Sequence, residues 1–252
     1  MVRTVTTVHI FGDSAMADVV LHRANRILGA LPQAELDALL PHLSVVPLQR
    51  DTILIREGER LSHIYFPHRG VVSQMLLMHN GETAEVTTVG PEGLVGFAAV
   101  LGRTHADARK ITQIAGSASC IPTSHLLEAM GEGTCLRRLI FLYLNAFLRQ
   151  TCYFVACNAL HSVEERAARW LLMVHDKALQ DTFDITQEYL AEMLAVRRAS
   201  VNLVCRTFQQ GGLIRYRRGV IQILDRPGLE ELSCECYQTI RDIFDELFIS
   251  ER

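Results

Sequence analysis

Arginine is concentrated in one segment of this 252-residue chain. Between Met193 and Leu224 the sequence holds six arginines and neither aspartate nor glutamate. A solvated surface helix ordinarily mixes both signs of charge, whereas guanidinium groups without competing carboxylates suit the phosphates of a polyanion. The pattern predicts a nucleic-acid-binding surface, and the alternative is a surface helix that is basic by chance. The six residues are Arg197, Arg198, Arg206, Arg215, Arg217 and Arg218.

The net charge of the whole chain, −3, conceals this segment. From Arg226 to the end there are three arginines and seven acidic residues, so the tail offsets the basic segment. The distribution of charge along the chain is therefore more informative than its sum.

The elements that must position the arginines follow from helix caps and apolar spacing. Thr186 is a natural N-cap for a helix from Gln187 to Leu194, and a second helix follows from about Arg198 to Gln209. Leu213–Tyr216 and Val220–Leu224 then form a small β-hairpin. Two short helices and a hairpin in this order are typical of a winged helix-turn-helix.

The preceding part of the chain is predicted to be an antiparallel β-roll or jelly roll. From about Val45 to Ile121, short runs rich in Val, Ile and Thr alternate with glycine-containing turns, and Asn80-Gly81 favours a hairpin. The fold class is therefore α+β. We expect a loosely held arm (1–30), a β-roll sensor domain (31–134), a dimerisation helix (135–161), a winged helix-turn-helix (162–225) and an acidic helix (226–252).

The long helix predicted at residues 135–161 is apolar on two sides and needs cover on both. One side would pack on the β-roll and the other on the same helix of a second subunit, while a central helix of a monomer is the alternative. Ser162 and Glu165 form a capping box that starts a new helix, which places a boundary near 161/162. The predicted dimer contacts are Ile140, Tyr143, Phe147 and Phe154.

Residues 185–214, ITQEYLAEMLAVRRASVNLVCRTFQQGGLI, resemble the Crp/Fnr superfamily of transcription regulators, and the resemblance extends over about residues 31–224. It implies that Arg198 reads a base, for which a bidentate contact to guanine is suitable, although a phosphate contact is the alternative. The family's glutamate after this arginine is Ala199 here, so the operator should differ from the usual one. The residues expected to contact DNA are Thr186, Gln187, Arg197, Arg198, Ser200, Arg206, Arg217 and Arg218.

The resemblance also implies the partners of the chain. They are double-stranded DNA with a near-palindromic operator, a second copy of the chain, RNA polymerase and a small-molecule effector. Activation and repression by occlusion are equally compatible with the residues. The tail after Pro227 is expected to pack on the DNA-binding domain or across the dimer.

The sensor departs from the family's cyclic-nucleotide motif. Gly96-Phe97-Ala98 replaces Gly-Glu-Leu, and Arg109-Lys110-Ile111 replaces Arg-Ser/Thr-Ala. Phe97 cannot accept a hydrogen bond from a ribose hydroxyl, so we expect a signal other than cyclic AMP, with a cyclic-nucleotide receptor as the alternative. An anion could still bind near a glycine turn together with Arg109. The candidate effector residues are Gly93, Gly96, Phe97 and Arg109.

Cysteine positions predict neither a cofactor nor a metal site. No cysteine precedes Cys120, so the N-terminal iron–sulfur cluster of one family branch is not expected. Cys152 and Cys157 are about 140° apart around a helix and cannot share a metal within one chain. Cys234-Glu235-Cys236 suits a thiol switch or, as we prefer, two surface or half-buried helix cysteines.

Other function classes receive less support from the sequence. His63 and His68 could suggest a cupin-type metal enzyme, but no acid follows at the cupin spacing, and no catalytic residues are predicted. No uninterrupted apolar run reaches the ~18 residues of a membrane span. Seven scattered cysteines indicate reduced thiols in a cytoplasmic protein without a membrane partner.

Overall fold

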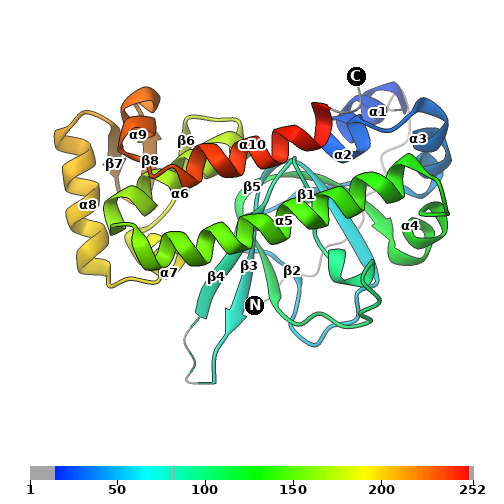
Figure 1. The fold of residues 1–252 in the computed structure, drawn as a ribbon, viewed down its shortest axis with the longest axis horizontal. Coiled ribbons are helices and arrows are strands. Elements are labelled where there is room, and N and C mark those ends of the chain that lie inside the picture. Colours follow the sequence, from blue (N-terminus) through cyan, green and yellow to red (C-terminus); the bar gives the residue numbers. More distant parts are fainter. Residues whose placement is uncertain (1–14, 80, 82, 250–252) are drawn as a thin grey trace.

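Helix α5 (Cys135–Leu160) joins two packed units at opposite ends of the molecule (Figure 1). The computed structural model describes residues 15–79, 81 and 83–249. One end holds the β-roll with the helices α1–α4, and the other holds the winged module with helix α8 outermost. The predicted α+β architecture is confirmed.

The β-roll is built from antiparallel pairs in the order β1-β5-β3-β4, with β2 also paired to β5. Strands β3 and β4 form the predicted hairpin, in which Gly81 has a positive φ of 85°, while Asn80 lies outside the described residues. Phe66, Ile64 and Ile121 are fully buried at the centre of the roll. The strands are β1 (Ser44–Leu48), β2 (Ile53–Ile55), β3 (His63–Leu77), β4 (Thr83–Val89) and β5 (Arg109–Pro122).

Short helices surround the roll, and the predicted loose arm is wrong for residues 15–30. The side chain of Asn25 accepts hydrogen bonds from the amides of Ile27 and Leu28 and donates to the carbonyls of Pro67 and Gly93 at 3.0 and 2.9 Å. This buried cap anchors the segment, and residues 1–14 lie outside the described part. The helices are α1 (Ala15–Arg23), α2 (Arg26–Gly29), α3 (Gln33–Leu39), η1 (Leu40–His42), η2 (Phe97–Ala99) and α4 (Thr123–Ala129).

The winged module begins at the predicted boundary. The hydroxyl of Ser162 accepts from the Glu165 amide at 3.2 Å, and the Glu165 carboxylate accepts from the Ser162 amide at 2.8 Å. A three-residue strand, β6, was not predicted, since its pairing with β8 completes a sheet that local sequence does not reveal. The elements are α6 (Val163–Ala178), β6 (Thr182–Asp184), α7 (Gln187–Leu194), α8 (Arg198–Gln210), β7 (Ile214–Arg217), β8 (Val220–Ile223) and α9 (Arg226–Leu232).

The acidic tail forms helix α10 (Cys236–Ile249), which runs alongside α5 (Figure 1). It reaches the sensor end, where the Arg26 guanidinium forms an ion pair with Asp245 at 2.8 Å and lies 4.3 Å from the centre of the Phe248 ring. The expectation that the tail packs on the DNA-binding domain or across a dimer is confirmed for its first part, because α9 packs on α6, whereas α10 packs chiefly on α5. Its apolar face covers one side of α5, although its start still touches α6.

The winged module docks directly on the β3–β4 hairpin of its own sensor. The Trp170 indole on α6 donates to the Glu85 carboxylate at 3.0 Å, and the Ser73 hydroxyl donates to the same carboxylate. Nearby, the Lys177 ammonium donates to the Thr88 carbonyl at 2.7 Å. These polar contacts fix the orientation of α6 against the roll.

Glu85 makes this docking sensitive to pH. Burial of its carboxyl raises the pKa, and the hydrogen bonds from Ser73 and Trp170 oppose that shift. Because the folded pKa lies above the unfolded value, the stabilisation from protonated Glu85 is present at low pH and is lost as pH rises through the folded pKa. Glu85→Gln should therefore gain stability relative to wild type as pH rises above the ordinary pKa of a glutamate, measured by urea unfolding. A difference that stays constant with pH would contradict this interpretation.

Candidate nucleic-acid interface and sensor cavity

Helix α8 buries one face and exposes the other. Val201, Val204 and Phe208 pack into the module, so the opposite face is left to solvent. Helix α7 before it starts at the predicted N-cap, where the Thr186 hydroxyl accepts from the Tyr189 amide at 3.1 Å. The turn between the helices depends on Ala195, which has a positive φ of 51°.

The hairpin formed by β7 and β8 lies beside the start of α7. At its tip Arg218 and Gly219 both have positive φ, 51° and 79°, as tight hairpins require. The Gly219 carbonyl accepts from the Ile185 amide at 2.8 Å, which brings the arginine-bearing tip next to Thr186. Strand β7 of the hairpin is held to α8, since the Tyr216 amide donates to the Gln209 side chain at 3.0 Å.

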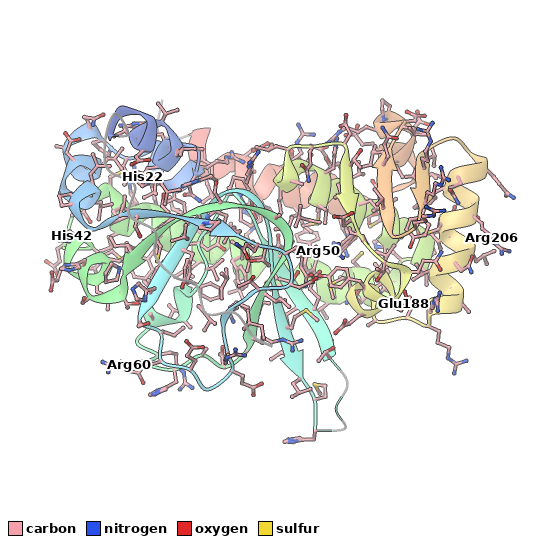
Figure 2. The ribbon with its side chains drawn as sticks, turned by 180° about the vertical axis from the view of Figure 1, so that it is seen from behind. His22, His42, Arg50, Arg60, Glu188 and Arg206 are labelled. Carbon is pink, nitrogen blue, oxygen red and sulfur yellow. The ribbon has the colours of Figure 1, made fainter. Side chains whose placement is uncertain are left out.

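All eight residues predicted to contact nucleic acid therefore lie on α7, α8, the turn between them and the adjoining hairpin. Gln187 and Ser200 are half-buried, and the other six are exposed. Arg206 projects from the outer edge of α8 (Figure 2). The structure thus gathers the basic residues at one end of the molecule, without testing what they contact.

Two residues of this surface were missed in the sequence. Glu188 forms an ion pair with Arg198 at 2.7 Å, and the two side chains are 61% and 65% exposed. An exposed pair contributes little stability, but it places a carboxylate beside Arg198, the arginine that precedes Ala199. Leu203, 67% exposed, lies one helical turn after Ala199 on the same side of α8.

The sensor cavity inside the β-roll is lined by two of the predicted effector residues, Gly96 and Phe97. Its volume is about 10 Å³, which is room for a single water and not for a nucleotide. Phe97 packs on Phe147 of α5 with ring centres 4.6 Å apart. Lys110, which sequence analysis noted only as a departure from the family motif, also lines the cavity, and burial lowers its pKa to about 8.

The other two predicted effector residues lie outside this cavity lining. A Cβ atom at Gly93 would be 2.3 Å from the Tyr143 ring, so this glycine permits close packing of α5 on the roll. Arg109 is half-buried, and its Nε has no hydrogen-bond partner among the described residues. The predicted four-residue anion site is therefore divided, and Gly93 has a packing role.

The predicted dimer contacts on α5 need correction. Ile140 and Tyr143 are 0% and 1% exposed within one chain, Phe147 packs on Phe97, and Phe154 lies under the Arg169 guanidinium at 4.4 Å. Ile140 and Tyr143 therefore pack within one chain, whereas Phe147 and Phe154 are half-buried and their place in a dimer stays a prediction. A different row is exposed, with seven-residue spacing: Phe141 (46%), Leu148 (62%) and Val155 (68%).

By length and composition, α5 is also the one described helix that could cross a membrane. Helices that pack within globular proteins share these properties. Here one side of α5 is buried against the roll and α10, while Leu142 and Leu160 are exposed beside the row of Phe141, Leu148 and Val155. Packing within the fold accounts for part of the apolar composition, since 28% of the most apolar stretch of the helix is buried.

The histidines considered for a cupin site do not come together. His63 is exposed and bonds Ser62 at 3.0 Å, whereas His68 is buried between Ser117 and Ser119 at 3.1 and 2.7 Å. Burial lowers the pKa of His68 to about 4.

The expectation that Cys234 and Cys236 are surface or half-buried cysteines is wrong. Both are buried, at 4% and 3% exposure.

Two family models match this chain. Residues 165–232 match the Crp-like helix-turn-helix domain, and residues 45–132 match the cyclic nucleotide-binding domain. These ranges coincide with the winged module and with the β-roll. The cavity described above therefore lies within the cyclic-nucleotide-binding-like domain.

Known regulators resemble the chain over most of its length. A CRP-like cAMP-activated global transcriptional regulator of Mycobacterium tuberculosis is 26% identical over 217 residues, covering 82% of this chain and 96% of that protein. An anaerobic regulatory protein of Haemophilus influenzae is 22% identical over 194 residues, 74% of this chain and 75% of that protein. In fold, FixK2 from Bradyrhizobium japonicum is similar, with a TM-score of 0.64, 16% identity, and 76% and 98% coverage of the two chains.

The exposed arginines can be separated by their effect on sequence preference. Arg198→Ala should weaken binding to a specific site by about 1–3 kcal/mol and relax the preference for one base. Arg217→Ala should weaken binding to every DNA sequence and lower the salt dependence, since a phosphate contact releases counterions. Fluorescence anisotropy with a selected and a random duplex at several salt concentrations measures both. An equal loss for Arg198→Ala on the two duplexes would assign that side chain to a phosphate.

Proposed function

Because this chain belongs to the Crp/Fnr family of DNA-binding transcription regulators, we propose that it binds a near-palindromic operator as a homodimer under the control of a signal other than cyclic AMP. The observation that carries the proposal is the exposed arginine surface of α8 and the wing at one end of the molecule. Phosphate binding by such a surface supplies most of the affinity for DNA, and base contacts supply the preference for one DNA sequence.

Base reading would fall to the outer side of α8. Arg198 would bind guanine through O6 and N7, and Glu188, its ion-pair partner, would accept a hydrogen bond from a cytosine amino group. Ala199 and Leu203 offer apolar surface for a thymine methyl group. Arg197, Arg206, Arg217 and Arg218 are exposed around this side and would contact phosphates.

Dimerisation would use the exposed row of α5. Phe141, Leu148 and Val155 repeat every seven residues, which is the spacing of one core position in a two-stranded coiled coil. Pairing two copies of α5 in parallel would place the two α8 helices on one side of the dimer. They could then enter successive major grooves, about 34 Å apart, of one operator.

The small volume of the sensor cavity supports a signal other than cyclic AMP. Phe97 fills the place where the family motif has a glutamate for the ribose, and the cavity holds about 10 Å³. Lys110 is buried there, and its ammonium donates to the Ala108 carbonyl at 3.3 Å. A small anionic effector would pair with this ammonium, and opening of the cavity would reach α5 through Phe97 and Phe147.

The remaining assignments follow from this function. The chain would act in the cytoplasm and without catalysis. It would regulate either by contacting RNA polymerase or by occluding a promoter. Operator selection from genomic fragments distinguishes these outcomes, since activators and repressors differ in the position of their sites.

A charge in the exposed row of α5 should disrupt the dimer. Leu148→Asp should weaken self-association at least ~10-fold, because an unpaired carboxylate would be buried in the interface. Sedimentation velocity over a range of concentrations measures the effect. Leu101→Asp is the matched control, since Leu101 is a similarly exposed leucine (59%) away from α5. Self-association that both variants retain would remove α5 from the interface.

Cyclic nucleotides should not bind the sensor. Calorimetry with cyclic AMP and cyclic GMP should give no heat of binding, since Phe97 and Lys110 occupy the positions that the ligand would need. Arg109→Ala is the control variant, because Arg109 aligns with the arginine that binds the cyclic phosphate in the family motif. Micromolar binding that disappears in Arg109→Ala would establish a cyclic-nucleotide receptor instead.

A further inference from the structure

Four side chains that bind soft metals meet where α5 ends and α10 begins. Cys157 and His161 are one helical turn apart at the end of α5, and Cys234 and Cys236 flank the start of α10. All four ligand atoms lie within 4.8 Å of one another. Two short separations define the group: Cys157 Sγ to Cys234 Sγ at 3.5 Å, and Cys236 Sγ to His161 Nδ1 at 3.7 Å.

These separations fit one tetrahedral ion. Zinc binds thiolate sulfur at about 2.3 Å and imidazole nitrogen at about 2.0 Å, which gives ligand-to-ligand distances of roughly 3.5–3.8 Å in a tetrahedron. Three cysteines and one histidine are also a common donor set of closed, structural zinc sites. The three cysteines are buried and His161 is half-buried, so the donors form an enclosed group.

The histidine is held as a ligand would be. Its Nε2 lies 3.2 Å from the carboxylate of Glu235, while its Nδ1 is directed at Cys236. A proton on Nε2 that is donated to Glu235 leaves the Nδ1 lone pair free for a metal. Carboxylates in this position orient most metal-binding histidines and raise their basicity.

The positive charge of two buried arginines beside the four side chains also favours an anionic group there. Arg166 and Arg169 are 8% and 5% exposed, and the Nε atom of each has no hydrogen-bond partner among the described residues. Both guanidinium groups interact electrostatically with Cys157. Three thiolates, one divalent ion and a neutral histidine carry a net charge of −1, which would offset part of this buried positive charge.

We propose that Cys157, His161, Cys234 and Cys236 bind one zinc ion, which fastens the C-terminal helix α10 to the end of α5. The site lies at the junction between the dimerisation helix and the winged module, since α6 begins directly after its capping residue Ser162. The ion would fix the position of α10, whose other end reaches Arg26 of the sensor. Zinc would thereby hold the tail as a strap between the two units.

Metal content and cobalt spectra of the full-length protein test the proposal. Protein purified without chelator should contain one zinc per chain by elemental analysis. After zinc removal under reducing conditions, Co²⁺ should produce the visible bands of tetrahedral cobalt–thiolate coordination, and Zn²⁺ should abolish them. Cys234→Ser should lose the bound zinc. Cys152→Ser should retain it, because Cys152 is an exposed cysteine on α5, the helix that carries Cys157, and is not one of the four ligands. Glu235→Gln should bind Co²⁺ ~10-fold more weakly.

The effect of a chelator on thermal unfolding distinguishes loss of the metal site from general misfolding of a variant. Chelator should lower the Tm of the wild type and of Cys152→Ser but leave the Tm of Cys234→Ser unchanged. Wild-type protein that neither contains zinc nor produces cobalt–thiolate bands would overturn the proposal. So would a Cys157–Cys234 disulfide in the freshly purified protein, or an equal loss of metal in Cys152→Ser.

Discussion

The structure depends on covering helix α5. This helix has 26 residues, of which only Arg137, Arg138 and Arg149 are charged, so exposing its many apolar side chains to water is costly. The β-roll covers one side through Tyr143 and Ile140, and α10 covers another. What remains is the row of Phe141, Leu148 and Val155, for which a second subunit is the simplest cover. The position of the sensor, the path of the tail and the proposed dimer axis all follow from this one constraint.

The same helix determines how a signal could reach DNA. Phe97 of the sensor cavity packs on Phe147 of α5, and α6 of the winged module docks on the β3–β4 hairpin through Glu85 and Trp170. A change in the cavity therefore has two routes to α8, one through α5 and one through the hairpin. The proposed zinc site lies at the end of α5, beside the first route. A bound ion would hold α10 against α5 and so keep the sensor and the winged module together. A transition between two poses of the winged module is a known mode of switching.

Sequence reasoning succeeded where local chemistry decides structure. Caps at Thr186 and Ser162 located two helix starts to the residue, and the acid-free arginine run identified the surface on α8 and the wing. It failed where one pattern allows several partners. Helical periodicity showed that α5 has apolar sides, but which side meets a second subunit depends on where the roll and α10 lie. A helix after residue 226 was foreseen, but the packing of α10 on α5 was not.

Sites assembled from distant residues were also beyond reach. Cys157 and Cys234 are 77 positions apart, and their meeting depends on the return of the chain along α5. His22, whose ring bonds Ser119 at 2.6 Å beside His68, lies in a segment that was predicted to be loose. Glu188 could be placed beside Arg198 only once the turn at Ala195 was known. Each is a contact between elements, for which spacing within one element carries no signal.

Hydroxyl-radical footprinting on an operator selected from genomic fragments tests the central claim most directly. A dimer joined along α5 and reading DNA with two α8 helices should protect two patches related by a two-fold axis and centred about one helical turn apart. Protection of a single patch, or of patches without two-fold symmetry, would contradict the dimeric arrangement and the role assigned to the exposed row of α5.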